Sequence, residues 1–263
     1  MRRPVQDPLP TVRWASTVTL TVARRPLTNG NVRLSGGGMV QIPAAGLTLN
    51  TGNSGANGLN TGSDLTVDRW RYVYLYDNAG TAAVTMDNTD PDTGPSAGVL
   101  SGVNYRYIAP VYITTASVIE PFYLQDGHWS YTRASNVAQA VYDWNNSIGA
   151  NTWTTSADMF AVYALPTTAG EVQLGSAART AAGNFKRVAL VADSSQPSYT
   201  PYEPSPGGNY AFTFTQWQEL NGMQTVRVWL PVIDGNLYVY HHTSSAIPGT
   251  VQVMGFNDKL LKR

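Results

Sequence analysis

Three aspartates lie close together between residues 87 and 92 and could bind a cation. This segment reads Asp-Asn-Thr-Asp-Pro-Asp, so Asp87, Asp90 and Asp92 place three carboxylates within six residues. Carboxylate oxygens are the hard ligands that calcium takes in proteins. Their spacing differs from that of the EF-hand loop, and the same residue types are typical of an exposed turn built from Asx residues and proline. Calcium binding is therefore an alternative to a structural turn.

Acidic residues and histidines also suggest acid–base chemistry, of the kind that glycoside hydrolases perform with two carboxyl groups. The candidate carboxylates stand singly in the sequence, at Glu120, Asp126, Glu203 and Glu219. His128 lies near Asp126 in a turn with no nucleophile beside it, which favours a structural role. His241 and His242 are adjacent, so on a strand they point to opposite faces and cannot both bind one metal ion. We expect no catalytic residue, no metal site and no cofactor.

A bias towards arginine marks the first 34 residues. They contain six arginines and one acidic residue, although the whole chain has 17 basic and 17 acidic residues. Guanidinium groups make paired hydrogen bonds with carboxylates, and prolines at positions 4, 8 and 10 favour an extended start. We therefore predict an N-terminal arm that anchors the chain to a partner protein. The contact candidates are Arg2, Arg3, Arg13, Trp14, Arg24, Arg25 and Arg33.

Two alternatives to the anchoring arm stay open. The arginines at 24, 25 and 33 also suit the solvated end of a strand. Val18, Leu20 and Val22 alternate with threonines, which predicts a strand from Trp14 to Ala23. Such a strand could belong to the core of the neighbouring domain.

The strongest strand signal lies at residues 70–76, which read Trp-Arg-Tyr-Val-Tyr-Leu-Tyr. Successive side chains of a strand point to opposite faces. One face is therefore aromatic, with Trp70, Tyr72, Tyr74 and Tyr76, and the other is mostly aliphatic. We expect a central core strand that is covered on both faces. Asp-Asn-Ala-Gly at 77–80 predicts a turn in which Asn and Gly take positive φ, so residues 81–86 should complete a β-hairpin.

Short strands joined by turns are indicated along the whole chain, and no long window keeps a helical period. We predict an all-β fold with two antiparallel β-sandwich (jelly-roll-like) domains and an extended N-terminal arm. The expected ranges are 1–34 for the arm, 35–132 for the first sandwich and 133–263 for the second. Pro110 and Pro121 interrupt strand candidates, which predicts edge positions or bulges.

Composition argues against several classes of protein. The formal net charge is zero and only 13% of residues are charged, so we expect no nucleic-acid partner. The chain has no cysteine, which removes disulfides and thiolate metal sites. No apolar run reaches the length of about 20 residues that crosses a bilayer, and the N-terminus lacks the apolar segment of a signal peptide. We expect no membrane insertion.

Several short motifs follow one another in a fixed order along the chain. Gly-Leu-Asn-Thr-Gly-Ser at 58–63 precedes the aromatic strand at 70–76 and the turn Phe-Tyr-Leu-Gln-Asp-Gly at 122–127, and they are followed by Leu-Pro-Thr-Thr-Ala-Gly-Glu-Val at 165–172 and Val-Gln-Val-Met-Gly-Phe at 251–256. This order, over residues 38–256, resembles a tail-fibre or head-fibre-like domain of tailed-phage virion proteins. Asn60 stands where such domains often have Asp, and Pro110 and Tyr112 depart from the usual strand. The resemblance implies a structural protein of a phage or phage-like particle, such as a gene transfer agent, without a cofactor.

The expected function is that of a non-enzymatic virion protein, made in the host cytoplasm. It would be a subunit of a head spike or head fibre, a capsid decoration, a collar or a tail fibre. We expect it to form a homo-oligomer, as a trimer or another cyclic ring, to bind other virion proteins through the arm, and to contact host surface polysaccharide during host attachment. The alternative is a carbohydrate-binding module or a glycan-active enzyme on a β-sandwich.

Overall fold

The computed structural model describes residues 9–26, 28–65, 69–114, 116–131, 143–148, 152–155, 165–179, 186–191, 214–218, 223–231, 238–242 and 247–261. Within these residues the regular elements are β-strands and two short 3-10 helices, η1 (Ser35–Gly37) and η2 (Gly98–Leu100). The predicted all-β class is therefore confirmed. No helix in these residues is long and apolar enough to span a membrane.

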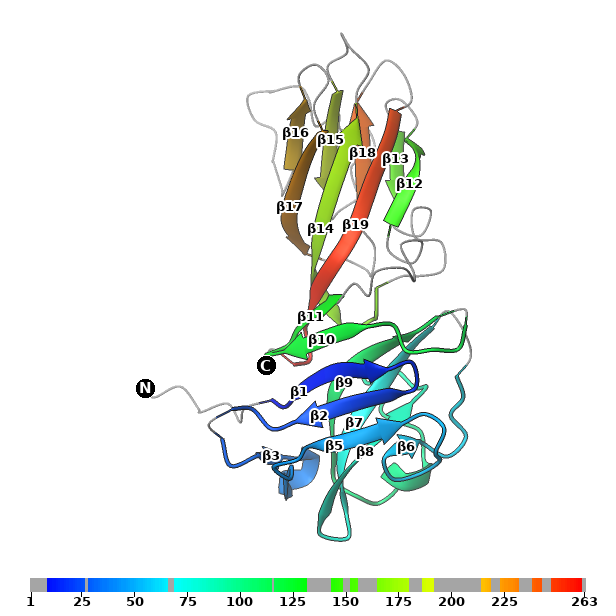
Figure 1. Cartoon of the computed structure of the whole chain (residues 1–263), viewed down its shortest axis with the longest axis vertical. Helices are drawn as coiled ribbons and strands as arrows, with labels where there is room; N and C mark the ends of the chain where they lie inside the picture. Colours follow the sequence, from blue (N-terminus) through cyan, green and yellow to red (C-terminus); the bar gives the residue numbers. More distant parts are fainter. Residues whose placement is uncertain are drawn as a thin grey trace. The chain divides into compact units, whose positions relative to one another are not determined.

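The chain forms two compact units. Unit 1 contains residues 1–136, 166–168 and 258–263, and unit 2 contains residues 137–165 and 169–257 (Figure 1). The division between them lies near the predicted boundary at residue 133. Two short segments from the predicted second domain, 166–168 and 258–263, belong to unit 1 instead.

Unit 1 contains an antiparallel sheet with the strand order β11-β10-β1-β2-β5. Its strands are β1 (Thr11–Ser16), β2 (Thr19–Ala23), β5 (Leu47–Asn50), β10 (Phe122–Gln125) and β11 (His128–Tyr131). Val12 on β1 and Leu20 and Val22 on β2 are apolar and fully buried, whereas their neighbours along each strand are more exposed. This alternation is what a strand with one face on a core requires.

A second sheet of unit 1 has the order β6-β8-β7-β9. Its strands are β6 (Gly58–Leu59), β7 (Arg69–Asn78), β8 (Thr81–Asp87) and β9 (Tyr105–Ile113), and the short pair β3 (Asn31–Arg33) and β4 (Met39–Gln41) lies in the same unit. The predicted hairpin is confirmed as β7 and β8, which pair antiparallel. β6 is an exception to the antiparallel pattern, because it pairs parallel to β8.

The turn of this hairpin differs in one detail from the prediction. Ala79 has a φ of 51° and Gly80 a φ of 86°, so Ala79 rather than Asn78 takes the left-handed conformation. The Asp77 carboxylate accepts a hydrogen bond from the Gly80 N–H at 2.7 Å. This bond supports the positive φ values, which give the turn the twist that a two-residue hairpin needs.

β9 is an edge strand of its sheet, as Pro110 predicts. Pro110 pairs with Tyr72 of β7, and the register shifts between Val73 and Tyr74, as at a β-bulge. The Pro110 carbonyl accepts a hydrogen bond from the buried indole N–H of Trp129 on β11 at 3.1 Å. This bond connects the two sheets of unit 1, whose arrangement is sandwich-like.

The predicted N-terminal arm is wrong for residues 11–34. β1 pairs with β2 and with β10, and β3 pairs with β4. Val12, Leu20 and Val22 are fully buried, because β1 and β2 supply apolar side chains to the core of unit 1. Residues 1–8 lie outside the described part of the chain.

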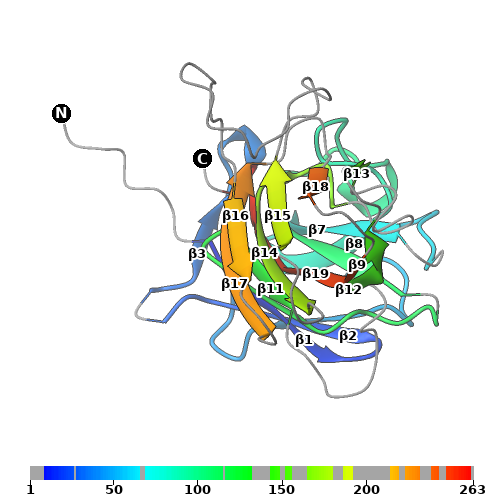
Figure 2. The same cartoon turned by 90° about the horizontal axis from the view of Figure 1, so that it is seen from above.

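Unit 2 has eight described strands in two sheets, which Figure 2 shows as two layers. The strands are β12 (Asp143–Ile148), β13 (Thr152–Thr155), β14 (Ala169–Arg179), β15 (Lys186–Val191), β16 (Phe214–Gln218), β17 (Met223–Pro231), β18 (Tyr238–His242) and β19 (Ile247–Asp258). One sheet has the order β17-β14-β19-β12 and the other the order β13-β18-β15-β16.

The pairing in unit 2 is nested. The first described strand of the unit pairs with the last, β12 with β19, and the second with the seventh, β13 with β18. The third pairs with the sixth, β14 with β17, and the fourth with the fifth, β15 with β16. All four pairs are antiparallel, as in one long hairpin rolled over into two sheets. Eight strands in this arrangement form a jelly roll, so unit 2 has the predicted architecture.

Candidate functional site

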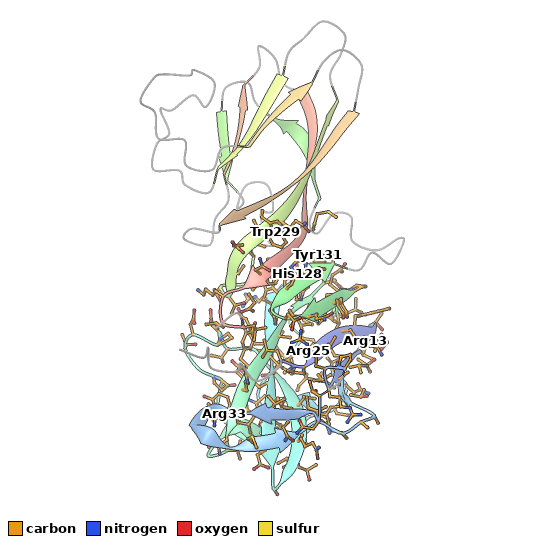
Figure 3. All side chains as sticks on the ribbon, turned by 90° about the vertical axis from the view of Figure 1, so that its left-hand side faces the viewer. Arg13, Arg25, Arg33, His128, Tyr131 and Trp229 are labelled. Carbon is orange, nitrogen blue, oxygen red and sulfur yellow. The ribbon has the colours of Figure 1, made fainter. Side chains whose placement is uncertain are left out.

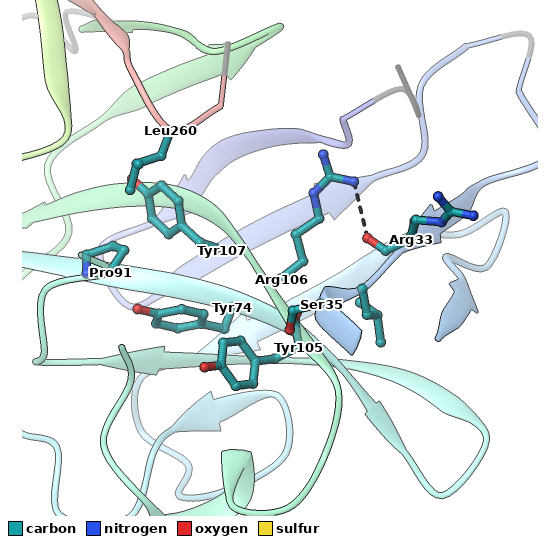
Figure 4. Close-up of a pocket in the computed structure, with 9 residues that line it drawn as sticks. Arg33, Ser35, Tyr74, Pro91, Tyr105, Arg106, Tyr107 and Leu260 are labelled. Atoms are coloured by element: carbon teal, nitrogen blue, oxygen red, sulfur yellow. Dashed lines mark hydrogen bonds between the residues drawn. The ribbon is translucent and has the colours of Figure 1, made fainter. Parts of the chain in front are cut away.

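A pocket of about 450 Å³ lies in unit 1 beside the aromatic face of β7 and β9 (Figure 4). Its lining combines three tyrosines with two arginines and a serine, namely Tyr74, Tyr105, Tyr107, Arg33, Arg106 and Ser35. The volume falls within the range of small-molecule sites, which are mostly apolar or aromatic with a few polar groups.

Tyr74 from β7 forms part of the buried core and also lines the pocket. Its ring meets the edge of Tyr105 with centroids 5.7 Å apart and lies 6.0 Å from the ring of Tyr107. The Tyr74 side chain is only 1% exposed. No other described residue forms a hydrogen bond with its hydroxyl. Burial raises the pKa of this hydroxyl well above its ordinary value, so the group is neutral and can donate a proton to an acceptor.

Tyr107 from β9 is held in place by a buried carboxyl group. Its hydroxyl donates to Asp258 at 2.6 Å, and Asp258 also accepts from the N–H groups of Leu260 and Leu261. Burial raises the pKa of the Tyr107 hydroxyl well above its usual range. This network fixes residues 258–261 beside the pocket, where Leu260 contributes an apolar wall.

The two arginines lie at one end of the pocket. The Arg106 guanidinium donates through Nη1 to the carbonyl oxygen of Arg33 at 3.2 Å. Ser35 donates to the carbonyl oxygen of Tyr105 at 2.5 Å. These two bonds join the segment around η1 to β9. They restrict the Arg106 side chain before any ligand arrives, which lowers the entropy cost of binding.

The predicted calcium residues do not converge. Among the described residues no group of three histidine, cysteine or acidic side chains could hold a metal ion. Asp87 is fully buried and accepts hydrogen bonds from Asn60, Ser96 and the N–H of Thr89. Asp90 accepts from the N–H of Asp92 at 2.9 Å, and Asp92 pairs with Lys259 at 3.4 Å. The segment is therefore a turn stabilised by its own carboxylates.

Burial and hydrogen bonding oppose one another at Asp87. Burial alone would raise the pKa of its carboxyl group. The hydrogen bonds from Ser96, Asn60 and Thr89 stabilise the charged form and outweigh burial, so the pKa of Asp87 lies below its ordinary value. Asn60 is itself 1% exposed. The Asp87 carboxylate is therefore a structural element of unit 1.

The predicted assembly residues are spread over unit 1. Figure 3 shows Arg33 well apart from Arg13, which is exposed on β1. Arg24 is also exposed, and Arg25 pairs with Asp126 of the β10–β11 turn at 2.7 Å. Arg33 lines the pocket. Trp14 is half-buried on β1, and Arg2 and Arg3 lie outside the described residues.

The predicted aromatic core strand is present in β7. Tyr72, Tyr74 and Tyr76 are buried in one apolar cluster, and Trp70 is half-buried against it. Burial raises the pKa of Tyr72 to about 12, and its hydroxyl lies 3.2 Å from that of Thr167. On the opposite face the Arg71 guanidinium is buried and pairs with Asp64 at 3.0 Å.

The residues considered for acid–base chemistry also occupy separate places. Asp126 pairs with Arg25, and Glu120 is 2% exposed. His128 Nε2 lies 2.9 Å from the Ser130 hydroxyl. Glu203 and Glu219 lie outside the described residues. His241 and His242 lie on β18, but their side chains lie outside the described part.

Sequence reasoning missed Tyr105, Tyr107 and Arg106 as site residues. Tyr105 and Tyr107 alternate in the sequence, which was enough to indicate an aromatic face on that strand. Their position beside β7 depends on register, which pairs Tyr107 with Tyr74 and Tyr105 with Tyr76. The sequence alone contains no signal for that register.

Comparisons of this chain with models of protein families, with curated proteins and with solved structures found no match.

Proposed function

We propose that this chain is a non-enzymatic structural subunit of a phage or phage-like particle, such as a head spike or fibre, a decoration, a collar or a tail fibre. The nested pairing of β12–β19, β13–β18, β14–β17 and β15–β16 is the observation that carries the proposal. Jelly rolls are an architecture of viral capsid and lectin domains. The order of sequence motifs supports the same class of protein, by analogy of fold and motif.

The use of the acidic side chains supports a non-enzymatic role. Asp87, Asp126 and Asp258 each make structural contacts, with Asn60, Arg25 and Tyr107 respectively. A glycoside hydrolase needs two carboxyl groups that face one scissile bond. These three carboxylates instead hold neighbouring segments of unit 1 in place.

Electron microscopy of intact particles tests the proposal directly. Particles are labelled with an antibody raised against the full chain, and label at a defined position on the particle is the expected result. Light scattering of the purified chain should show a closed homo-oligomer, such as a trimer. Unlabelled particles together with a monomer in solution would contradict the proposal.

A carbohydrate-binding module is the second candidate, and the pocket of unit 1 favours it. Tyr74, Tyr105 and Tyr107 surround a cavity with polar groups at its ends, as in many small-molecule sites. A module of this class would bind sugar as a monomer and would be absent from particles. The labelling experiment therefore separates the two candidates.

A further inference from the structure

We infer that the pocket of unit 1 binds a sugar residue that carries a carboxylate, as in a surface polysaccharide that contains uronic acid. This inference extends the proposed function, because it names the ligand class and the site for contact with a host surface. It concerns the chain itself and can be tested without a particle.

The Tyr74 hydroxyl lies at one end of the pocket (Figure 4). It is buried, it points towards the Pro91 side of the pocket in Figure 4, and no other described residue satisfies it. A buried hydroxyl without a partner destabilises the fold, whereas phenylalanine would fill the same core position without that cost. A ligand oxygen in the pocket would supply the missing acceptor.

Positive charge lies at the other end of the pocket (Figure 4). Figure 4 shows the Arg106 guanidinium on the side opposite the Tyr74 hydroxyl, held by its bond to the Arg33 carbonyl oxygen. A planar guanidinium binds carboxylates with good geometry, and the exposed side chain of Arg33 adds a second positive charge nearby. The acidic loop acts at the Tyr74 end instead, where Asp87 and Asp90 add to the effect of burial on the pKa of Tyr74, and Asp92 pairs with Lys259 at 3.4 Å.

An apolar and aromatic surface lies between these two ends. The tyrosine rings at 74, 105 and 107, with Leu260, offer apolar and aromatic area. The C–H groups on one face of a pyranose ring pack on such surfaces, while its hydroxyl groups point outward to hydrogen-bond partners. A uronic acid has a carboxylate at one end, hydroxyl groups at the other and this apolar face between them. Its carboxylate, apolar face and hydroxyl groups therefore match Arg106, the tyrosine rings and the Tyr74 hydroxyl, in that order along the pocket.

The test measures binding of methyl glucuronide to the full chain by saturation-transfer NMR and titration. The matched ligand is methyl glucoside, which has the same ring without the carboxylate. We expect millimolar binding of the glucuronide and at least about tenfold weaker binding of the glucoside, because hydrogen bonds to charged groups contribute about 1.5 to 3 kcal/mol. Equal binding of the two sugars, or no binding of either, would overturn the inference.

Three variants locate the site. Arg106→Gln should weaken glucuronide binding about tenfold or more, and Tyr74→Phe should weaken it several-fold while thermal stability stays equal or rises. Arg13→Gln removes an exposed arginine from β1 and should leave affinity unchanged. If Arg13→Gln weakened binding as much as Arg106→Gln, or if Tyr74→Phe had no effect on affinity, the pocket would not be the site.

Inorganic phosphate serves as the probe for general anion binding. The pocket should prefer the glucuronide, because phosphate has no apolar ring to pack on the tyrosines. Phosphate binding of equal affinity would contradict a sugar site. Particle labelling is independent of these titrations. If the chain binds glucuronide but is absent from particles, the pocket is still a sugar-binding site, and only the virion role is refuted.

Discussion

Asn60→Asp is a sharp test of the buried network around Asp87. The Asn60 side-chain nitrogen donates to the Asp87 carboxylate and to the carbonyl oxygen of Ala97, the latter at 2.7 Å. Its oxygen accepts from the N–H groups of Thr61 at 2.9 Å and Val99 at 3.0 Å. Aspartate has the same shape. It keeps the two accepted bonds but turns the donor that faces Asp87 into a second acceptor.

The expected cost follows from the burial of both groups. Asn60 is 1% exposed and Asp87 is fully buried, so two carboxylates would face each other at hydrogen-bonding distance without solvent between them. Both cannot be ionised at that separation. Disrupting a buried charged contact of this kind costs about 3 to 5 kcal/mol, a large part of the about 5 to 15 kcal/mol that stabilises a typical domain.

The stabilities of the natural chain and of Asn60→Asp should change with pH in opposite directions. In the natural chain the lowered pKa of Asp87 contributes stability above the ordinary carboxyl pKa, and this contribution is lost as pH falls through the folded-state pKa. In Asn60→Asp one proton is shared, which raises the folded-state pKa of the pair. That variant loses stability as pH rises from about 4 towards neutrality. The difference between the two proteins should therefore shrink in acid.

Calorimetric unfolding at a series of pH values measures this difference. Asn78→Asp is the matched control, because Asn78 is exposed in the hairpin turn and the substitution adds the same charge. We expect the control to change the free energy of unfolding by no more than about 0.5 kcal/mol. An equally small change for Asn60→Asp, or a change that does not vary with pH, would refute the reasoning.

Three further predictions concern the core and the chain start. Tyr74→Ala should lower the free energy of unfolding by about 3 to 5 kcal/mol, because it empties a position that is 1% exposed; unchanged calorimetric unfolding would contradict this. Gly98→Ala should cost about 1 to 3 kcal/mol and more than Gly102→Ala. Both glycines have positive φ, but only at Gly98 would the new Cβ meet other side chains, those of Asn60 and Thr61. Deletion of residues 1–34 should unfold unit 1, as read by circular dichroism and amide NMR, because it removes β1 and β2; a folded, soluble truncated chain would show that the sheet does not need them.

Local features of unit 1 could be predicted from the sequence. The alternation in β7 and the turn residues at 77–80 act over two to four positions, so neighbouring side chains suffice to specify the hairpin. The Asp126-Gly127 turn between β10 and β11 is of the same kind, since both residues adopt positive φ. Pro110 lacks a backbone donor, which predicts an edge position or a bulge, and β9 is an edge strand with a register shift beside Pro110.

Asn60 shows where the sequence stops being informative. Asn60 and Asp87 are 27 positions apart, and their hydrogen bond forms because β6 pairs parallel to β8. Without that pairing, the sequence gives no reason to expect Asn60 beside Asp87. With the pairing, Asn60 can donate a hydrogen bond to the buried Asp87 carboxylate, which an aspartate at position 60 could not do while ionised.

Alternation, turn chemistry and composition by themselves determined that this is an all-β chain, because each of these depends on residues close together along the backbone. Tertiary structure was needed to place β1, β2 and β3 in their sheets, to pair the strands of unit 2 in a nested order, and to bring Arg106 beside the tyrosines. These outcomes depend on which remote strands bury their apolar faces together. Many pairings satisfy the same local pattern, and the choice among them is made by packing and hydrogen bonding over the whole unit.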